Sequence, residues 1–163
     1  MDSYYKIKEK VHNIINFYST NGPKTIADFL GIIILHSDLG SIEGFLQTYS
    51  NKYIIHVNTA IEDERKKDRI IAHELGHYFL HKHLNAFCIN THTLAFEATL
   101  ENEANLFATE LLLTDAMIYE ELTFIQDMNV YELSAYFNLD LDIVKMKHDL
   151  FFLTHKELTF SKN

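Results

Sequence analysis

The chain has 163 residues, 47% of them hydrophobic and 13% aromatic, and it carries a formal net charge of −9 at pH 7. A chain of this length and apolar content can bury a core of its own, which argues against intrinsic disorder. The negative charge argues against non-specific nucleic-acid binding, because the phosphates would be repelled.

The N-terminal part of the chain predicts two helices. Apolar residues recur at helical spacing from Ile7 to Tyr18, and we expect a helix over residues 3–18. A turn-forming segment at residues 20–23 ends it. A short helix over residues 24–30 follows, with Pro23 in its first turn.

Three short apolar runs then predict a small sheet. Residues 32–36, 44–49 and 53–57 have the β-branched and apolar composition of strands. Only residues 50–52 separate the last two runs, which indicates a hairpin. We therefore expect a three-stranded, mainly antiparallel sheet directly before the next helix.

Helices fill the rest of the chain. An amphipathic pattern predicts a helix over residues 62–85, and a polar loop over 86–93 leads to a second strong helix over 94–113. Two or three short helices follow, as far as residue 152. This order of elements indicates an α+β fold in which the sheet packs against a helical core.

No linker-like segment interrupts the sequence, and we expect one domain over residues 1–163. Its parts would be N-terminal helices (1–31), the sheet with the two long helices (32–113) and a C-terminal helical segment (114–163).

The sequence has no secretion signal before the first helix and no apolar run as long as a membrane span. The single cysteine, Cys88, cannot form a disulfide within the chain, which fits a reducing compartment. We therefore expect a cytoplasmic protein that contacts no membrane.

The first long helix contains the HExxH segment His73-Glu74-Leu75-Gly76-His77. Its two histidines are four residues apart, so their rings lie on one face of a helix, one turn apart. Two imidazoles at this separation can hold one zinc ion, and a carboxylate beside the first can act on a water at that zinc. The pattern predicts a zinc-dependent peptidase with Glu74 as the general base. The simpler alternative is a surface helix that carries two histidines by chance.

A hydrolytic zinc site needs a third protein ligand and leaves one position open. The second long helix offers four glutamates: Glu97, Glu101, Glu103 and Glu110. Glu101 and Glu103 lie nearly opposite each other around a helix, so only one of them can face the metal. Glu101 shares its face with small residues, which permits close helix packing, and we predict it as the ligand. Glu103 remains the alternative.

Two further residues near the motif have specific interpretations. Asn105, one turn after Glu101, can accept the free ring N–H of His73 or His77, or it is a surface amide. Gly76 is unfavourable inside a helix, and its predicted role is to let another backbone come close.

The oxyanion formed during peptide hydrolysis needs a donor besides the metal. Several side chains qualify and the sequence leaves the choice open: Tyr78, His81, His83, His92 and Tyr136. His81 has a second interpretation, as a partly buried, hydrogen-bonded histidine that closes the motif helix. We interpret Cys88 as a packing or bystander residue rather than as an inhibitory metal ligand.

Two segments together resemble the ImmA/IrrE family of zinc metallopeptidases: the stretch from His73 to His81 and the stretch from Glu101 to Leu112. The strand region before the motif and residues 135–139 are similar to the same family, and the resemblance extends over residues 29–147. It is closest to the ImmA branch, which phages and integrative conjugative elements encode. The chain departs from the family pattern after the second helix, where many relatives have a proline.

The resemblance implies a zincin-like fold and a zinc metalloendopeptidase of the gluzincin type. It implies that His73, His77 and Glu101 bind Zn²⁺, with Mn²⁺ as the alternative metal, and that Glu74 is catalytic. ImmA-like proteins cleave a helix-turn-helix transcriptional repressor at a specific site and so derepress a mobile element. The expected partner is such a repressor, as substrate, without direct contact to nucleic acid.

Two alternatives act by binding alone. A non-cleaving anti-repressor would keep the metal site, but Glu74 argues against it because a structural site needs no free carboxylate. A DNA-binding regulator is suggested by the apolar spacing of residues 132–144, which is similar to a helix-turn-helix. Acidic residues outnumber basic ones from residue 115 onward, which disfavours phosphate binding there.

Overall fold

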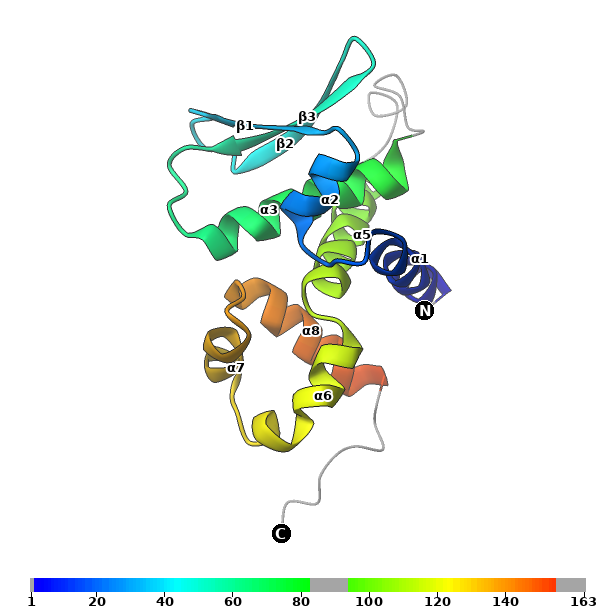
Figure 1. Ribbon diagram of the computed structural model, residues 1–163, viewed down its shortest axis with the longest axis vertical. Helices are drawn as coiled ribbons and strands as arrows, with labels where there is room; N and C mark the ends of the chain where they lie inside the picture. Colours follow the sequence, from blue (N-terminus) through cyan, green and yellow to red (C-terminus); the bar gives the residue numbers. More distant parts are fainter. Residues whose placement is uncertain (1, 83–93, 155–163) are drawn as a thin grey trace.

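The computed structural model describes residues 2–82 and 94–154, which form an α+β fold (Figure 1). Its elements in chain order are α1 (Asp2–Tyr18), α2 (Pro23–Phe29), β1 (Ile33–Ser37), β2 (Gly44–Tyr49), β3 (Lys52–Asn58), α3 (Glu64–Gly76), the π-helical turn η1 (His77–His81), α5 (Leu94–Leu112), α6 (Asp115–Ile125), α7 (Val130–Phe137) and α8 (Leu141–Thr154). The predicted α+β class and the order of elements are confirmed. The largest difference lies in the motif helix, which changes to the wider π-helical turn after Gly76.

The sheet has the strand order β1-β3-β2. β2 and β3 pair antiparallel through a tight hairpin at Ser50 and Asn51, whose φ angles are 49° and 61°. β1 pairs with β3 in parallel, so the sheet is mixed, and the expectation of a mainly antiparallel sheet is wrong at this pairing. β3 is the most deeply buried strand, with Ile55 and Val57 completely inaccessible, and the central position gives it a neighbour on each side.

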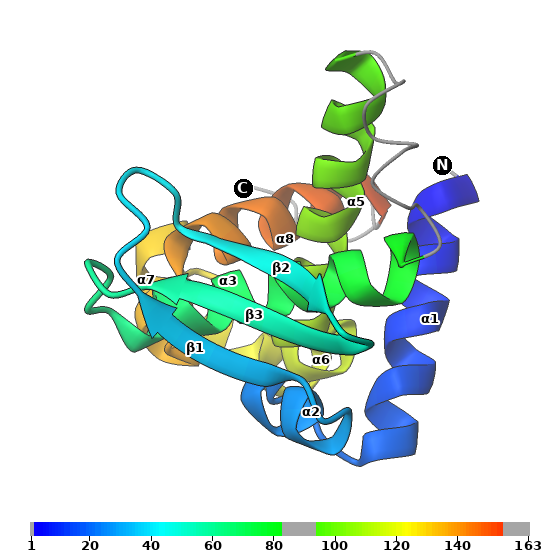
Figure 2. The same ribbon diagram turned by 90° about the horizontal axis from the view of Figure 1, so that it is seen from above.

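Within the described residues, helices cover one face of the sheet and leave the other without a helix (Figure 2). On the covered face, Ile55 of β3 and Ile71 of α3 are completely buried in the core. On the opposite face, Leu35 and Phe45 are exposed, and the Phe45 ring stacks on His56 with 4.5 Å between ring centroids. Among the described strands β2 pairs with β3 alone, so its other edge has no neighbouring strand.

α5 links the two ends of the molecule. It contacts α3 beneath the sheet, lies beside α1, and reaches α8 with its far end (Figure 1). Phe107 and Leu111 on its inner side are completely buried. Neither α5 nor any other helix within the described residues is long and apolar enough to cross a membrane.

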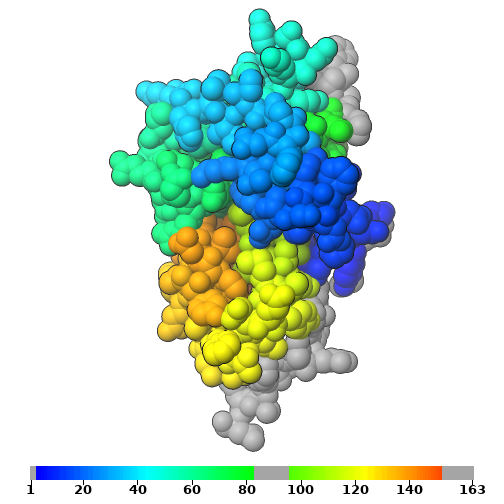
Figure 3. Space-filling model, in the orientation of Figure 1, coloured from blue at the N-terminus to red at the C-terminus, as the bar shows by residue number. Residues whose placement is uncertain are grey.

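The three C-terminal helices form the lower part of the molecule, seen in yellow and orange in Figures 1 and 3. Thr114 caps α6, its hydroxyl accepting the N–H of Met117, so the segment that departs from the family pattern begins a helix of its own. Buried Lys147 of α8 pairs with Glu110 of α5 at 2.7 Å and with Asp115 of α6 at 2.6 Å. This buried ion cluster joins three helices.

Candidate metal centre

The two motif histidines project from consecutive turns of one helical segment. Asp63 caps the start of α3, its carboxylate accepting the N–H of Arg65; α3 carries His73, and η1 begins at His77. The Nε2 atoms of His73 and His77 are 3.1 Å apart. Burial, together with the neighbouring His73, lowers the pKa of His77 to about 4. Its ring is therefore neutral at pH 7, the form that binds a metal.

Glu101 of α5 completes a cluster with these rings. Its Oε2 lies 3.2 Å from Nε2 of His73, and its Oε1 lies 3.3 Å from Nε2 of His77. Four ligands about 2 Å from a tetrahedral zinc ion are roughly 3.3 Å apart from one another. Two imidazole nitrogens and a carboxylate at this spacing are therefore a donor set that could hold a tetrahedral metal ion such as zinc.

Glu103 has a different set of partners. Its Oε2 lies 3.1 Å from Nε2 of His81, and its Oε1 accepts the hydroxyl of Ser3 at 2.7 Å. Burial alone would raise the pKa of Glu103, but the hydrogen bonds from Ser3 and His81 outweigh it and hold the pKa below its ordinary value. The two glutamates face opposite sides of α5, and only Glu101 joins the histidine cluster.

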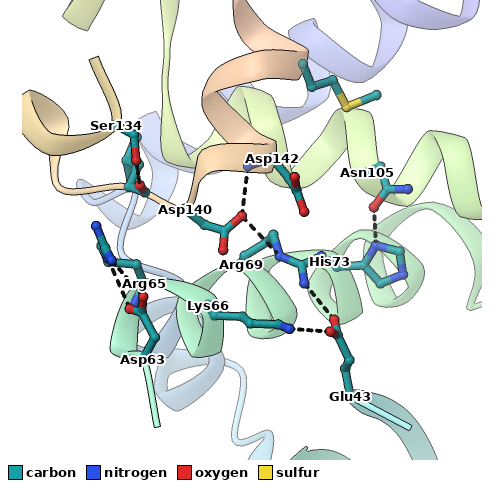
Figure 4. A network of polar contacts seen from close by, with 12 residues as sticks. Glu43, Asp63, Arg65, Lys66, Arg69, His73, Asn105, Ser134, Asp140 and Asp142 are labelled. Carbon is teal, nitrogen blue, oxygen red and sulfur yellow. Dashed lines mark hydrogen bonds and ion pairs between the residues drawn. The ribbon is translucent and has the colours of Figure 1, made fainter. Parts of the chain in front are cut away.

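Asn105 orients the first histidine. Its Oδ1 lies 2.9 Å from Nδ1 of His73 and accepts the ring N–H, as Figure 4 shows. A proton on Nδ1 leaves Nε2 free to bind a metal. This contact confirms the interpretation of Asn105 as a partner of a motif histidine.

Gly76 allows α3 and α5 to pack closely enough to form the cluster. A Cβ at this position would lie 3.0 Å from Cα and 3.1 Å from the carbonyl oxygen of Ala104. Both are backbone atoms of the opposite helix, and they cannot move without shifting it. The predicted role of Gly76, the close approach of another backbone, is confirmed.

Glu74 lies beside the cluster in a cleft of about 910 Å³. The cleft is lined by β2 residues including Leu46, by the three cluster residues and by Leu100 of α5. Burial, and then the charge of Glu101, raise the pKa of Glu74 to about 7, while the backbone N–H of Leu46 acts to lower it. A divalent cation at the cluster would favour the ionised carboxylate.

A salt-bridge network holds the start of β2 against α3. Glu43 binds Lys66 at 2.5 Å and Arg69 at 2.6 Å, and Arg69 also faces Asp140 at 3.5 Å (Figure 4). Glu43 precedes Gly44, where β2 enters the cleft. The network therefore connects the cleft wall to the α7–α8 junction.

The candidate oxyanion donors have different surroundings in the structure. Tyr136 is an exposed residue of α7 that binds Glu121, and Tyr78 packs edge-on against Tyr53. His81 contacts His77 and Glu103, which matches its second interpretation as a buried, hydrogen-bonded histidine. His83, His92 and Cys88 lie outside the described residues.

Lys82 in the cleft and a chain of side-chain contacts from His77 were not predicted from the sequence. Lys82 lines the cleft, with its Nζ 5.1 Å from the centroid of the Tyr78 ring. The chain of contacts runs from His77 through His81 and Glu103 to Ser3. Its signal in the sequence is the spacing of His81 one turn after His77, but nothing in that spacing identifies Glu103 as the partner.

Residues 27–148 match the family model of the IrrE N-terminal-like domain, a peptidase family. Over 135 residues the chain is 43% identical to the metallopeptidase ImmA of Bacillus subtilis (strain 168), covering 82% of this chain and 78% of ImmA. The chain belongs to the ImmA/IrrE family of metallopeptidases. It is also 34% identical over 117 residues to an uncharacterized immunity region protein 2 of Bacillus phage phi105, covering 71% of this chain and 73% of that protein.

The family match extends from α2 to α8 and so includes the sheet, both helices of the cluster and the C-terminal helices. Membership of a metallopeptidase family implies a metal ion. Among the described residues, His73, His77 and Glu101 form the group of side chains that can hold one, with their ligand atoms all within 4.8 Å of one another.

Proposed function

We propose that this ImmA/IrrE metallopeptidase is a zinc-dependent endopeptidase that cleaves a helix-turn-helix repressor at a specific site and thereby derepresses a mobile element. The observation that carries the proposal is the His73, His77 and Glu101 cluster beside a buried Glu74 in an open cleft. The repressor as substrate rests on the resemblance to ImmA-like proteins. A relative named for a phage immunity region also favours a target within a mobile element.

The proposed mechanism assigns a separate task to each side chain. His73, His77 and Glu101 would hold the metal, which supplies Lewis-acid chemistry by polarising the scissile carbonyl and lowering the pKa of a water. Glu74, as a carboxylate, takes the proton of the attacking water and delivers it to the leaving amine. Burial makes this carboxylate more basic than an exposed one, which helps it to accept the proton, while a cation at the cluster would keep it ionised beforehand.

The position of β2 supports binding of an extended substrate. β3 is paired on both sides, so the sheet edge available beside the cleft is that of β2, whose Gly44 and Leu46 line the cleft. A peptide that adds to this edge as a further strand would hydrogen-bond through its backbone and pass the cluster. The scissile bond would then lie in an unstructured or opened segment of the repressor.

The test is a cleavage assay with the purified zinc-loaded protein and candidate helix-turn-helix repressors, beginning with any that is encoded beside its gene. Wild-type protein should yield two repressor fragments, identified by mass spectrometry. Glu74→Gln should bind zinc and repressor as before but cleave roughly 100- to 10,000-fold more slowly, the usual contribution of a general base. Glu120→Gln, an exposed substitution on α6, is the matched control and should cleave normally.

Two results would contradict the proposal. If Glu74→Gln inactivates the repressor at the wild-type rate, a non-cleaving anti-repressor is the better description. If the protein alone shifts operator DNA in a salt-dependent manner and leaves the repressor intact, a DNA-binding regulator is the better description.

A further inference from the structure

We infer that His81 and Glu103 form a positioning chain that sets the tautomer and orientation of His77, and that Ser3 extends this chain to the N-terminal helix. The inference rests on the proposed metal site, because it concerns how His77 is prepared to bind the ion. None of these three residues belongs to the group that would bind the metal: His81 contacts His77 directly, and Glu103 and Ser3 act through His81.

The chain is continuous in the structure. Nδ1 of His77 lies 3.1 Å from Nδ1 of His81, and Nε2 of His81 lies 3.1 Å from Oε2 of Glu103. The other oxygen of Glu103 accepts the hydroxyl of Ser3 at 2.7 Å. The side chain of His81 is only 9% exposed, so water has little access to compete for its ring nitrogens.

The direction of the hydrogen bonds follows from the chemistry of imidazole. If Nε2 of His77 binds the metal, its Nδ1 must carry the proton and donate it. Nδ1 of His81 must then accept, which places the proton of His81 on Nε2. That proton points at the Glu103 carboxylate, which can only accept. One arrangement of protons satisfies every link, and it leaves Nε2 of His77 free for the metal.

The two motif histidines are therefore held in different ways. His73 donates directly to the amide oxygen of Asn105, whereas His77 donates to a second imidazole that is itself held by a carboxylate. Partners of this kind orient a ligand and raise its basicity, and their loss typically weakens metal binding 10- to 100-fold. Ser3 lies before the matched residues 27–148, so α1 adds a contact that the family match does not include.

The experiment measures zinc affinity by competition with a chromogenic chelator, in the Glu74→Gln background so that no peptide is cleaved. His81→Leu removes both ring nitrogens at similar volume and should weaken zinc binding by roughly 10- to 100-fold. His81→Asn places an amide oxygen near the position of Nδ1, so it can still accept from His77 and should restore most of the affinity. Asn102→Ala, an exposed change on α5, should leave the affinity unchanged.

Glu103→Ala provides a second test that does not depend on a buried residue, because this side chain is 26% exposed. It should weaken zinc binding less than His81→Leu, since the His81 ring can still accept in one of its two tautomers. If Glu103 acts through His81, the double variant should bind zinc no more weakly than His81→Leu alone. Substitution of Co²⁺ should show an altered visible absorption spectrum in His81→Leu and a near-native one in His81→Asn.

The outcomes separate this inference from the proposed function. If the Glu74→Gln parent binds no zinc, the metal site and the proposed function both fail. If the parent binds zinc and His81→Leu folds and binds it equally tightly, only the positioning chain is wrong. Additive losses in the double variant would likewise overturn the chain, because they would show that Glu103 acts independently of His81.

Discussion

Glu101 and Glu103 illustrate how two identical residues acquire different tasks. They are two positions apart on α5, so their side chains point about 200° apart around the helix. Glu101 meets two imidazole nitrogens from the α3–η1 segment, and Glu103 meets His81 and the start of α1. The side chains that each carboxylate contacts therefore determine whether it can bind a metal or only accept hydrogen bonds.

Exchanging either carboxylate for an amide tests this division. Glu101→Gln removes the proposed anionic ligand and should weaken zinc binding by more than about 100-fold, beyond the range typical for outer partners. Glu103→Gln should weaken it less, since the amide oxygen can still accept from His81. Isothermal titration calorimetry with Zn²⁺ on the metal-free proteins measures both. A larger loss in Glu103→Gln would reverse the ligand assignment.

At the scale of elements, the site depends on how closely α3 and α5 approach each other. Gly76 faces the backbone of Ala104, and the small side chain at position 104 is itself completely buried. The cluster bridges these same two helices, with both histidines on the α3–η1 segment and Glu101 on α5. A change in the distance between the helices therefore changes the spacing of the ligands.

Gly76→Ala should consequently destabilise the protein, although alanine is the better helix former. The added methyl would lie 3.0 Å from Cα of Ala104, and overpacking of this kind costs about 1–3 kcal/mol. Urea denaturation measures the free energy of unfolding, and zinc titration should show weaker binding in the same variant. A gain of about 1 kcal/mol, as helix propensity alone predicts, would mean that α5 moves aside freely.

At the scale of the whole molecule, a buried ion cluster joins α1 and α5 to the C-terminal helices α6 and α8. Lys147 is 1% exposed and pairs with Glu110 and Asp115. Two residues of α1 also join the cluster: Tyr4 donates its hydroxyl hydrogen to Glu110, and Lys8 pairs with Asp115. Removing one member leaves charges of the opposite sign in a poorly solvated site.

Lys147→Met should therefore lower the free energy of unfolding by roughly 3–5 kcal/mol, the usual cost of leaving a buried charge without its partner. Lys145→Met changes an exposed lysine of the same helix and should have little effect. Chemical denaturation of both variants provides the comparison. Equal stability of the two variants would show that other groups or water neutralise the Glu110 charge when Lys147 is absent.

The same cluster should govern acid stability. Burial alone would raise the pKa of Asp115, but its bonds to Lys147 and Lys8 outweigh burial and hold the pKa below the ordinary value. Stabilisation by a depressed carboxyl is present above its unfolded pKa and is lost as pH falls through the folded one. We expect the melting temperature to decrease once the pH is lowered beneath about 4. The decrease should be smaller in Asp115→Asn, which lacks the titrating carboxyl, than in the exposed control Asp28→Asn.

Features set by short-range spacing were predictable from the sequence. His73 and His77 share a face because a helix repeats every 3.6 residues. The same geometry places Asn105 one turn after Glu101, and the cost of glycine inside a helix marks Gly76 as a special position. The hairpin of β2 and β3 is likewise local, since the two strands are separated only by a tight turn. The α+β class follows from the order of such elements.

Other features depended on which distant segments meet. The sequence placed Glu101 and Glu103 on opposite sides of a helix, but only the packing of α1, α3 and η1 against α5 determines what each one contacts. The parallel pairing of β1 with β3 depends on the chain crossing to the far edge before the hairpin returns. Buried Lys147 and the His81–Glu103 contact carry no periodic signal. By itself the sequence determined what recurs within one or two turns of the chain, because backbone geometry repeats there. The tertiary structure decided which of the candidate partners from distant segments meet, because packing selects them.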